Sequence, residues 1–284
     1  MPELPEVETI VRGLAPRLEG AEIGPIRLLF PPLLRRAAGA GLAILAGKHI
    51  LGVRRRGKMV LIACEGGWTL VFHLKMTGQL LLAPSGDPVD KHTRLLIPLL
   101  GRGLELRFRD VRKFGFLCCL GPGSAASAPE LDRLGPEPLE TGRAAFAALF
   151  RGRKGRIKSL LLDQRIVAGI GNIYADEVLF RARIHPLTSA AALGDAELET
   201  LWRSMRAILR RAIARKGSSI RDFTDPDGEP GDFQSSHKVY GREGKACRAC
   251  GTPVRRIRVG GRSTFFCPVC QRKRRARRSG PDAG

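Results

Sequence analysis

Apolar residues at helical spacing open the chain. They recur every three or four positions, at Val7, Ile10, Val11, Leu14 and Leu18. Pro5 is tolerated at a helix start, and Gly20 is a residue type at which helices commonly end. The pattern therefore predicts an amphipathic helix close to the N-terminus.

The pattern changes after residue 23 to short apolar or alternating runs. Gly, Pro and Asp separate these runs, which is typical of strands joined by turns. The runs cover residues 60–63, 69–74, 80–83, 94–99, 104–108 and 114–120. They predict a mainly β domain over residues 1–121, built as a sandwich or a barrel.

A segment rich in Gly, Pro, Ala and Ser, residues 122–138, is typical of a linker. Helical periodicity returns beyond it, and we expect a helical domain over residues 139–237. Its predicted helices cover residues 144–150, 157–162, 172–182 and 196–216. The polar stretch 217–234 predicts an exposed loop of the kind often found at a binding site.

Four of the seven cysteines form two Cys-x2-Cys pairs. Sixteen residues separate Cys247 and Cys250 from Cys267 and Cys270, and this spacing lets two turns offer four thiolates to one tetrahedral Zn²⁺. Disulfide bonds are the alternative, although nothing in the sequence indicates export. The arm between the pairs has the pattern of a β-hairpin, so we predict a zinc ribbon with one structural Zn²⁺.

The predicted ribbon, residues 238–271, carries four arginines on its hairpin, namely Arg255, Arg256, Arg258 and Arg262. A hairpin clamped by a metal presents guanidinium groups rigidly, which suits contact with phosphates. A purely structural ribbon is the alternative. The remaining cysteines, Cys64, Cys118 and Cys119, lie in apolar runs and are expected to be buried side chains rather than reactive thiols.

The charge of the chain favours a polyanionic partner. Its 284 residues include 49 Lys and Arg against 27 Asp and Glu, a formal net charge of +22. Cations that neutralise phosphates release counterions from nucleic acid, although acidic membranes and ribosomes also attract basic proteins. No run approaches the roughly 18 apolar residues of a membrane span. We expect a soluble, cytosolic protein with no membrane partner.

The charge is also unevenly distributed. Residues 1–22 hold five acids and only two bases, whereas residues 272–278 hold six bases. The basic tail, residues 272–284, is expected to be a solvated extension that adds nonspecific attraction. The acidic opening indicates a role other than binding a phosphate backbone.

The residues at the N-terminus suit covalent chemistry. Removal of Met1, which the small residue at position 2 permits, would leave Pro2 with a secondary amine. An α-amine titrates near 8, so it is far more nucleophilic at neutral pH than a lysine, and it can form an iminium with a sugar carbon. Nearby carboxylates, Glu3 and Glu6, could then move protons. Alternatively, the prolines and glutamates only favour the start of a helix.

These motifs together resemble the bacterial formamidopyrimidine-DNA glycosylase (Fpg/MutM) family. The resemblance spans almost the whole chain, at residues 2–9, 56–58, 73–78, 110–115, 134–139, 169–177, 239–242 and the zinc ribbon. It implies an α+β fold, with an N-terminal β-sandwich preceded by a helix, a helix–two-turn–helix domain and a C-terminal zinc ribbon. It further implies a bifunctional glycosylase and abasic-site lyase of base excision repair, which excises 8-oxoguanine and formamidopyrimidines.

The resemblance assigns catalytic roles by matching motif. Pro2 would attack C1′ and hold the iminium, Glu3 would donate and accept protons, and Glu6 would position or move them. Lys58 would approach the lesion and assist elimination, a role compatible with a phosphate contact. Arg262 would grip phosphates and serve δ-elimination after β-elimination.

Base flipping leaves a gap in the stack that side chains must fill. The resemblance assigns this wedge to Met76, Arg112 and Phe114. Considered without the family, Met76 and Phe114 would be ordinary core residues. Their Gly and charged neighbours are typical of loop tips instead.

Further DNA contacts follow from the resemblance, at His92, Arg153, Lys154, Lys158 and Asn172. Asn172 is also an attractive N-cap for the predicted helix that follows it. The loop 217–234 would correspond to the segment that closes over the flipped base.

Two other functions fit the same architecture. One is a noncatalytic module that recognises damaged DNA. The other is an endonuclease VIII-type enzyme, which prefers oxidised pyrimidines, although the opening Leu4-Pro5-Glu6 favours the purine branch. Lys216-Gly217-Ser218-Ser219 departs from the family pattern at the lesion loop. The expected partner is damaged double-stranded DNA, bound by a monomer in the bacterial cytoplasm and nucleoid.

Overall fold

The computed structural model describes residues 1–39, 41–123, 128–220 and 222–273. The chain divides into two compact units, each assembled from distant parts of the sequence. Unit 1 comprises Met1–Glu140, Gln164–Ile170 and Leu209–Ser236, and unit 2 comprises Thr141–Asp163, Gly171–Ile208 and His237–Gly284. All but two residues of the expected basic tail lie outside the described residues.

The predicted N-terminal helix is confirmed as α1 (Leu4–Leu18), which opens unit 1. It packs its apolar face against β4 (Ile50–Arg56) and β5 (Met59–Cys64). Gly20 follows with a φ of +74°, the left-handed conformation that lets the chain leave a helix. The helix α1 is thereby held against the sheet that contains β4 and β5.

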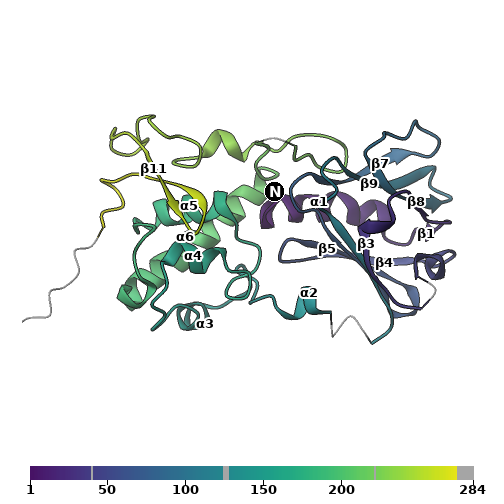
Figure 1. The fold of residues 1–284 in the computed structure, drawn as a ribbon, viewed down its shortest axis with the longest axis horizontal. Helices are drawn as coiled ribbons and strands as arrows, with labels where there is room; N and C mark the ends of the chain where they lie inside the picture. Colours follow the sequence, from purple (N-terminus) through teal and green to yellow (C-terminus); the bar gives the residue numbers. More distant parts are fainter. Residues whose placement is uncertain (40, 124–127, 221, 274–284) are drawn as a thin grey trace, which may run out of the picture. The chain divides into compact units, whose positions relative to one another are not determined.

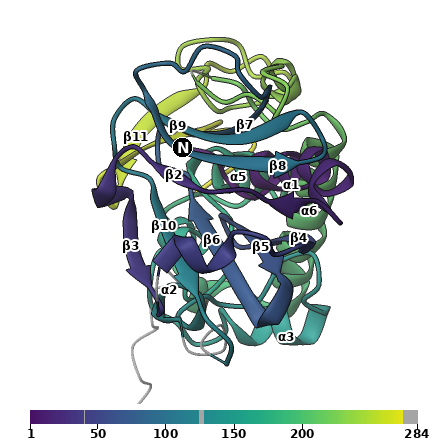
Figure 2. The same cartoon turned by 90° about the vertical axis from the view of Figure 1, so that its right-hand side faces the viewer.

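Two sheets form the rest of unit 1 (Figures 1 and 2). One has the order β1-β8-β9-β7, with β2 also paired to β8, and the other has the order β3-β10-β6-β5-β4. Their pairs are antiparallel except for β3 and β10. The remaining strands are β1 (Glu22–Ile23), β2 (Arg27–Leu28), β3 (Leu34–Ala37), β6 (Trp68–His73), β7 (Gly78–Pro84), β8 (Thr93–Leu100), β9 (Leu104–Asp110) and β10 (Phe116–Leu120).

The core of unit 1 lies between the two sheets. Phe72 of β6 stacks on Phe108 of β9, with ring centroids 5.9 Å apart. Leu14 of α1 and Ile97 of β8 belong to the same buried cluster. Burial of each such side chain contributes about 1.5–3 kcal/mol. Facing sheets with a shared core make this a sandwich rather than a barrel.

Unit 2 contains helices and a small hairpin. The predicted helices are found as α3 (Arg143–Ala148), α4 (Ile157–Leu162), α5 (Asn172–Arg181) and α6 (Asp195–Ala214), of which the residues from Leu209 onward belong to unit 1. The predicted hairpin is β11 (Arg255–Val259) paired with β12 (Arg262–Phe266). Within unit 2, β12 packs on α5, which in turn packs on α4. The α+β fold class is thus confirmed.

Short helices complete the described chain. α2 (Pro129–Asp132) lies within the expected linker. Single 3₁₀ turns occupy Pro31–Leu33, Gly41–Leu45, Glu65–Gly67, Ala190–Ala192 and Phe233–Ser236. Within the described ranges, none of the helices is both long enough and apolar enough to cross a membrane.

Candidate active site and nucleic-acid interface

The residues at the N-terminus lie in a tightly bonded, buried position. The N–H of Leu4 donates to the carbonyl of Gly169 at 3.0 Å, and the N–H of Glu3 donates to Glu6 Oε2 at 2.8 Å. The other carboxylate oxygen of Glu6 accepts from the N–H of Ser218 at 2.7 Å. Pro2, Glu3 and Glu6 are all buried. The sequence-predicted nucleophile and its carboxylates therefore occupy one place.

Gly217 allows the bond between Glu6 and the loop. Its φ is +76°, and a Cβ there would come within 2.6 Å of Glu6 Oε1. Only glycine combines this backbone conformation with so close an approach. The departure from the family pattern at residues 216–219 thus keeps the residue that this contact needs.

Burial lowers the pKa of the Met1 α-amino group, although the charges of Glu3 and Glu6 oppose the shift. The charge of Lys58 lowers this pKa further. A lowered pKa leaves more of the amine as free base at neutral pH. An amine, two carboxylates and an ammonium group are the residue types that the sequence-based hypothesis of covalent chemistry requires.

Lys58 lies on the turn between β4 and β5 and is 6% exposed. Gly57 before it has a φ of +57°, and its N–H donates to Glu137 Oε1 at 2.6 Å. Sequence reasoning missed Glu137, because no local pattern indicates a partner 80 residues away.

The predicted wedge residues lie on two loop tips of unit 1. Met76 between β6 and β7 is 39% exposed, and Phe114 between β9 and β10 is 50% exposed. The Arg112 guanidinium lies 4.6 Å from the centroid of the Phe114 ring. Exposure of large apolar side chains at turns contradicts the alternative that they belong to the core.

Asp110 joins these two loops. Its side chain is fully buried and accepts from Thr77 Oγ1 at 2.5 Å, from the N–H of Arg112 at 3.2 Å and from the N–H of Gly115 at 2.8 Å. His92, which is partly exposed, accepts from the N–H of Asp110 through its carbonyl. Asp110 thus fixes one wedge loop relative to the other.

The loop 217–234 is fastened to the sandwich at its middle. The nearly buried Asp225 accepts from the N–H groups of Asp227 and Glu229, both at 3.0 Å, and pairs with Lys216 at 2.9 Å. The carbonyl of Pro226 accepts from the N–H of a β7 residue at 2.9 Å. The middle of the loop is thereby tied to β7.

In unit 2, the turn that carries Arg262 is bonded to α4 and α5. The carbonyl of Ser263 accepts from Asn172 Nδ2 at 2.9 Å and from Lys158 Nζ at 3.2 Å. Lys158 also pairs with Asp176 at 2.7 Å, both side chains being fully buried. Burial raises the pKa of Asp176 to about 7, a rise that the charge of Lys158 opposes.

This arrangement changes two expectations. Gly171, not Asn172, is the N-cap of α5, and the Asn172 side chain reaches across to the hairpin instead of capping. Lys158 has no exposed surface, because it is held between α5 and β12; its contact with DNA stays a prediction. Arg153, Lys154 and Arg262 are exposed, as residues that touch DNA would be.

Buried acids fasten the ribbon to α5. Asp176 Oδ2 accepts from the N–H of Phe265 at 2.9 Å. Glu177 accepts from the N–H groups of Lys238, Val239 and Tyr240 at 2.9–3.0 Å. Sequence reasoning gave these two acids no role, although acids inside an apolar helix are themselves a signal that buried donors lie near.

The four predicted zinc ligands converge. Their Sγ atoms lie within 4.8 Å of one another, with Cys247 to Cys270 at 3.9 Å and Cys250 to Cys267 at 3.4 Å. Tetrahedral Zn²⁺ with bonds of about 2.3 Å would place its sulfurs about 3.8 Å apart. None of the seven cysteines is in a disulfide. The donor set fits one Zn²⁺.

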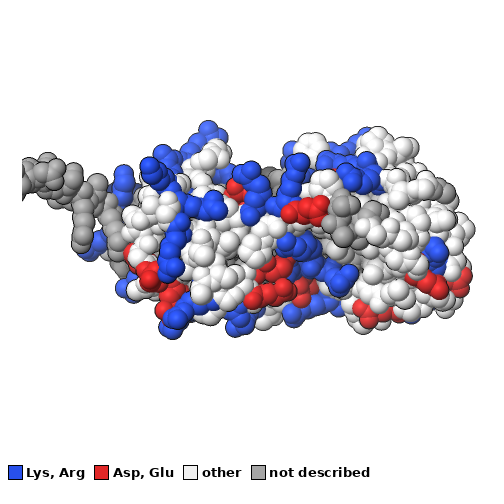
Figure 3. Space-filling view, turned by 90° about the horizontal axis from the view of Figure 1, so that it is seen from below, with Lys and Arg blue, Asp and Glu red and all other residues white. Residues whose placement is uncertain are grey.

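Lys and Arg side chains are spread over the face drawn in Figure 3, where Asp and Glu form only small groups. On the ribbon, Arg256, Arg258 and Ser263 line a shallow pocket of about 350 Å³. A basic surface of this kind suits phosphate contacts.

Family models match most of the chain. The formamidopyrimidine-DNA glycosylase N-terminal domain matches residues 1–117, and the H2TH domain of the same glycosylase matches residues 134–224. The zinc finger found in FPG and IleRS matches residues 244–272. With the convergent thiols, this last match confirms the prediction of one structural Zn²⁺.

Relatives of similar length carry one name. Proteins named formamidopyrimidine-DNA glycosylase are 48% identical in Thermus thermophilus, over 95% of this chain and 98% of theirs, and 45% identical in Geobacter sulfurreducens, over 96% and 100%. A Lactococcus lactis FPG mutant in complex with a Fapy-dG containing DNA superposes with a TM-score of 0.88 at 37% identity, covering 96% of this chain and 100% of that one. The crystal structure of the MutM (FPG) protein of Thermus thermophilus superposes with a TM-score of 0.85 at 45% identity, covering 95% of this chain and 98% of that one.

Proposed function

Because the chain belongs to the formamidopyrimidine-DNA glycosylase family, we propose that it is a bifunctional DNA glycosylase and abasic-site lyase of base excision repair. Its substrates are oxidised purines, such as 8-oxoguanine and formamidopyrimidines, in double-stranded DNA. It acts as a monomer in the bacterial cytoplasm, on the DNA of the nucleoid. The observation that carries this proposal is the burial of Pro2 beside two buried carboxylates, Glu3 and Glu6, which are themselves joined by a hydrogen bond.

The reaction begins once Met1 has been removed. The free amine of Pro2 attacks C1′ of the damaged nucleotide, and the new bond to nitrogen replaces the bond to the base, which leaves with a proton. The bond between C1′ and O4′ of the sugar ring then breaks, O4′ takes a proton, and the opened sugar is held on Pro2 as an iminium. Glu3 moves the protons of this step, and Glu6 positions the amine and its neighbours through the bonds it accepts from Glu3 and Ser218.

Strand cleavage follows by successive β- and δ-elimination from the iminium. Lys58 assists elimination, and Arg262 holds phosphates at the exposed start of β12. Met76, Arg112 and Phe114 fill the gap left by the flipped nucleotide, because their loops are exposed and joined by Asp110. His92, Arg153 and Lys154 contact the duplex, and Lys158 and Asn172 support the turn that bears Arg262.

A borohydride trap tests the covalent step. The protein, mixed with duplex containing 8-oxoguanine opposite cytosine and then reduced, should form a stable protein–DNA adduct. Pro2→Gly should weaken trapping and lyase activity far more than duplex binding. Retained binding with no adduct from the unsubstituted protein would instead favour the noncatalytic module that recognises damaged DNA.

The choice between purine and pyrimidine lesions needs its own comparison. A Lactococcus lactis Fpg has been crystallised with an oxidised pyrimidine containing DNA, so binding alone does not distinguish the two. Excision of 8-oxoguanine should be faster than excision of thymine glycol under single-turnover conditions. Much faster removal of thymine glycol would refute the purine assignment.

A further inference from the structure

The turn that carries Lys58 is held from outside its own sheet. Arg56 and Met59 form the last pair of β4 and β5, so only Gly57 and Lys58 make the turn. The ladder does not use the N–H of Gly57, which donates to Glu137 at 2.6 Å. The position of the turn therefore depends on a carboxylate 80 residues further along the chain.

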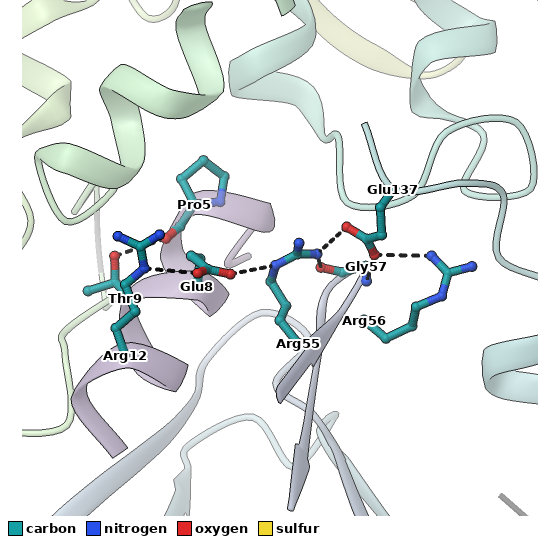
Figure 4. Close-up of polar contacts among 8 residues, drawn as sticks. All are labelled: Pro5, Glu8, Thr9, Arg12, Arg55, Arg56, Gly57 and Glu137. Atoms are coloured by element: carbon teal, nitrogen blue, oxygen red, sulfur yellow. Dashed lines mark hydrogen bonds and ion pairs between the residues drawn. The ribbon is translucent and has the colours of Figure 1, made fainter. Parts of the chain in front are cut away.

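Glu137 makes two further contacts with the same hairpin (Figure 4). Arg56 Nη1 donates to Oε1 at 3.0 Å, and Arg55 Nη1 forms an ion pair with Oε2 at 2.6 Å. The side chains of Glu137 and Arg55 are each 8% exposed. Arg56 Nη2 also donates to the carbonyls of Leu134 and Gly135, at 2.9 and 2.8 Å.

The network continues from the hairpin to α1. Arg55 Nε donates to Glu8 Oε2 at 3.0 Å, and Arg12 pairs with the other oxygen of Glu8 at 2.9 Å. Glu8 lies on the first turns of the helix that follows Pro2 and Glu3. Two carboxylates and one guanidinium thus connect the turn of Lys58 to the helix that bears the N-terminal amine.

We propose that Glu137 is a positioning residue that fixes Lys58 relative to the N-terminal amine, directly through Gly57 and, by way of Arg55 and Glu8, through α1. The inference rests on the proposed function, since it assumes that Lys58 acts at the lesion. Removal of one partner of a buried ion pair also destabilises a protein, because it leaves the other charge buried and unpaired. The effect of Glu137 on the geometry of the site is therefore measured against a variant that breaks another buried ion pair.

Glu137→Gln is the informative change. A glutamine keeps one oxygen that can accept from Gly57 and Arg56, but it presents an NH2 group or nothing to Arg55, so the change breaks the ion pair with Arg55. The control is Glu105→Gln, because Glu105 pairs with Arg107 at 2.6 Å and is similarly buried, but lies on β9 away from the turn. Any loss common to both variants reflects only the loss of a buried ion pair.

Single-turnover excision of 8-oxoguanine is the first measurement. Glu137→Gln should lower the rate at least about tenfold, because small displacements of a reacting group are costly, while its dissociation constant for the duplex stays within about twofold. Glu105→Gln should keep both within about twofold. An equal loss in the two variants would overturn the proposal.

A double-mutant cycle tests whether Glu137 acts through Lys58. In a Lys58→Met background, Glu137→Gln should cause no further loss of rate, since the group that it positions is gone. Independent, multiplicative losses would contradict the proposal. Glu8→Gln, at a partly exposed position, should also lower excision with duplex binding unchanged; unaltered excision would refute the connection through α1.

Hydrogen exchange separates the two proposals. The Gly57 amide should exchange at least about tenfold faster in Glu137→Ala, which removes its acceptor, than in the unsubstituted protein, and Glu105→Ala should leave it unchanged. Faster exchange in a protein that shows no excision at all would refute the proposed function and leave the positioning intact. Unchanged exchange would refute the positioning even in an active enzyme.

Discussion

At the scale of single residues, buried carboxylates organise the candidate site. A buried charge is costly unless donors or a counter-charge satisfy it. Glu6 accepts from the loop at Ser218, Asp110 joins the two wedge loops, and Glu177 holds three successive amides of the ribbon. Each acid therefore fixes the position of a segment outside its own element.

Gly217→Ala tests one of these contacts. The new Cβ would lie 2.6 Å from Glu6 Oε1 in a backbone conformation with φ +76°. We expect the free energy of unfolding to fall by about 2–4 kcal/mol, from backbone strain and steric overlap together. Borohydride trapping should fall as well, because Glu6 must move. Urea denaturation and the trapping assay measure the two effects.

Gly228→Ala is the matched control, in the same loop. Its φ is +86°, but a Cβ there meets nothing within 4 Å. It should lose only about 1–2 kcal/mol, and trapping should be unchanged. Equal losses of trapping in the two variants would mean that the contact with Glu6 is unimportant.

Sequence patterns predicted the environment of a residue only where that environment is set by its neighbours in the sequence. The spacing of the cysteines and the exposure of Phe114 follow from neighbouring residues, and both are found in the structure. Lys158 lies in a basic stretch and looks like a surface cation, yet Asp176, on a different helix, pairs with it and both are buried. No pattern among neighbouring residues predicts that Lys158 is buried or that Glu137 contacts the turn between β4 and β5.

At the scale of elements, hydrophobic periodicity predicted those helices and strands that pack one apolar face against a core. α1, β5 to β10 and the ribbon hairpin follow the predicted runs, because each has an apolar face against a core. β4 escaped prediction, since its sequence Ile-Leu-Gly-Val-Arg-Arg-Arg ends in three charged residues. Two of those, Arg55 and Arg56, are held by Glu137 rather than by apolar packing.

The structure of the zinc ribbon is expected to depend on its bound Zn²⁺. Cys250→Ser removes one ligand at an exposed position, so the packing around it is unaffected. We expect loss of bound zinc and a fall of at least about tenfold in duplex affinity, because the hairpin would lose its clamp. Metal analysis of the purified protein and a binding titration measure both. Chelation of zinc should weaken duplex binding and trapping together.

Cys118→Ser provides the comparison. Cys118 is a buried thiol of β10 outside the four-cysteine cluster, and burial raises its pKa to about 11. The variant should retain its zinc and its affinity while losing about 1 kcal/mol of stability. Undiminished zinc in Cys250→Ser would contradict the four-thiolate site.

At the scale of the whole molecule, the net charge of +22 acts in more than one way. Many cations are occupied internally, as Arg55, Arg107 and Lys158 are. Only the Lys and Arg side chains that are exposed can contact phosphates and make the affinity for DNA depend on salt. Composition alone overstates the electrostatic attraction to DNA for this reason.

The basic tail tests how much of that attraction is nonspecific. Replacement of four of its arginines, Arg274, Arg275, Arg277 and Arg278, by Gln should weaken binding to undamaged duplex. The slope of log affinity against log salt should become shallower, by up to about 0.9 for each arginine that meets a phosphate. Replacement by Lys should preserve the slope, and single-turnover excision at saturating protein should be the same in both. A slope unaffected by Gln would show that the tail does not contact DNA.

The assembly of unit 1 from three separate stretches has a consequence for the order of synthesis. The residues around Glu6 are bonded to Gly169 and Ser218, which the ribosome adds much later. A nascent chain can begin the sandwich early, but its amine and carboxylates reach their final places only when residue 218 has emerged. A prematurely terminated chain therefore carries its N-terminal amine without the contacts that Gly169 and Ser218 make with Leu4 and Glu6.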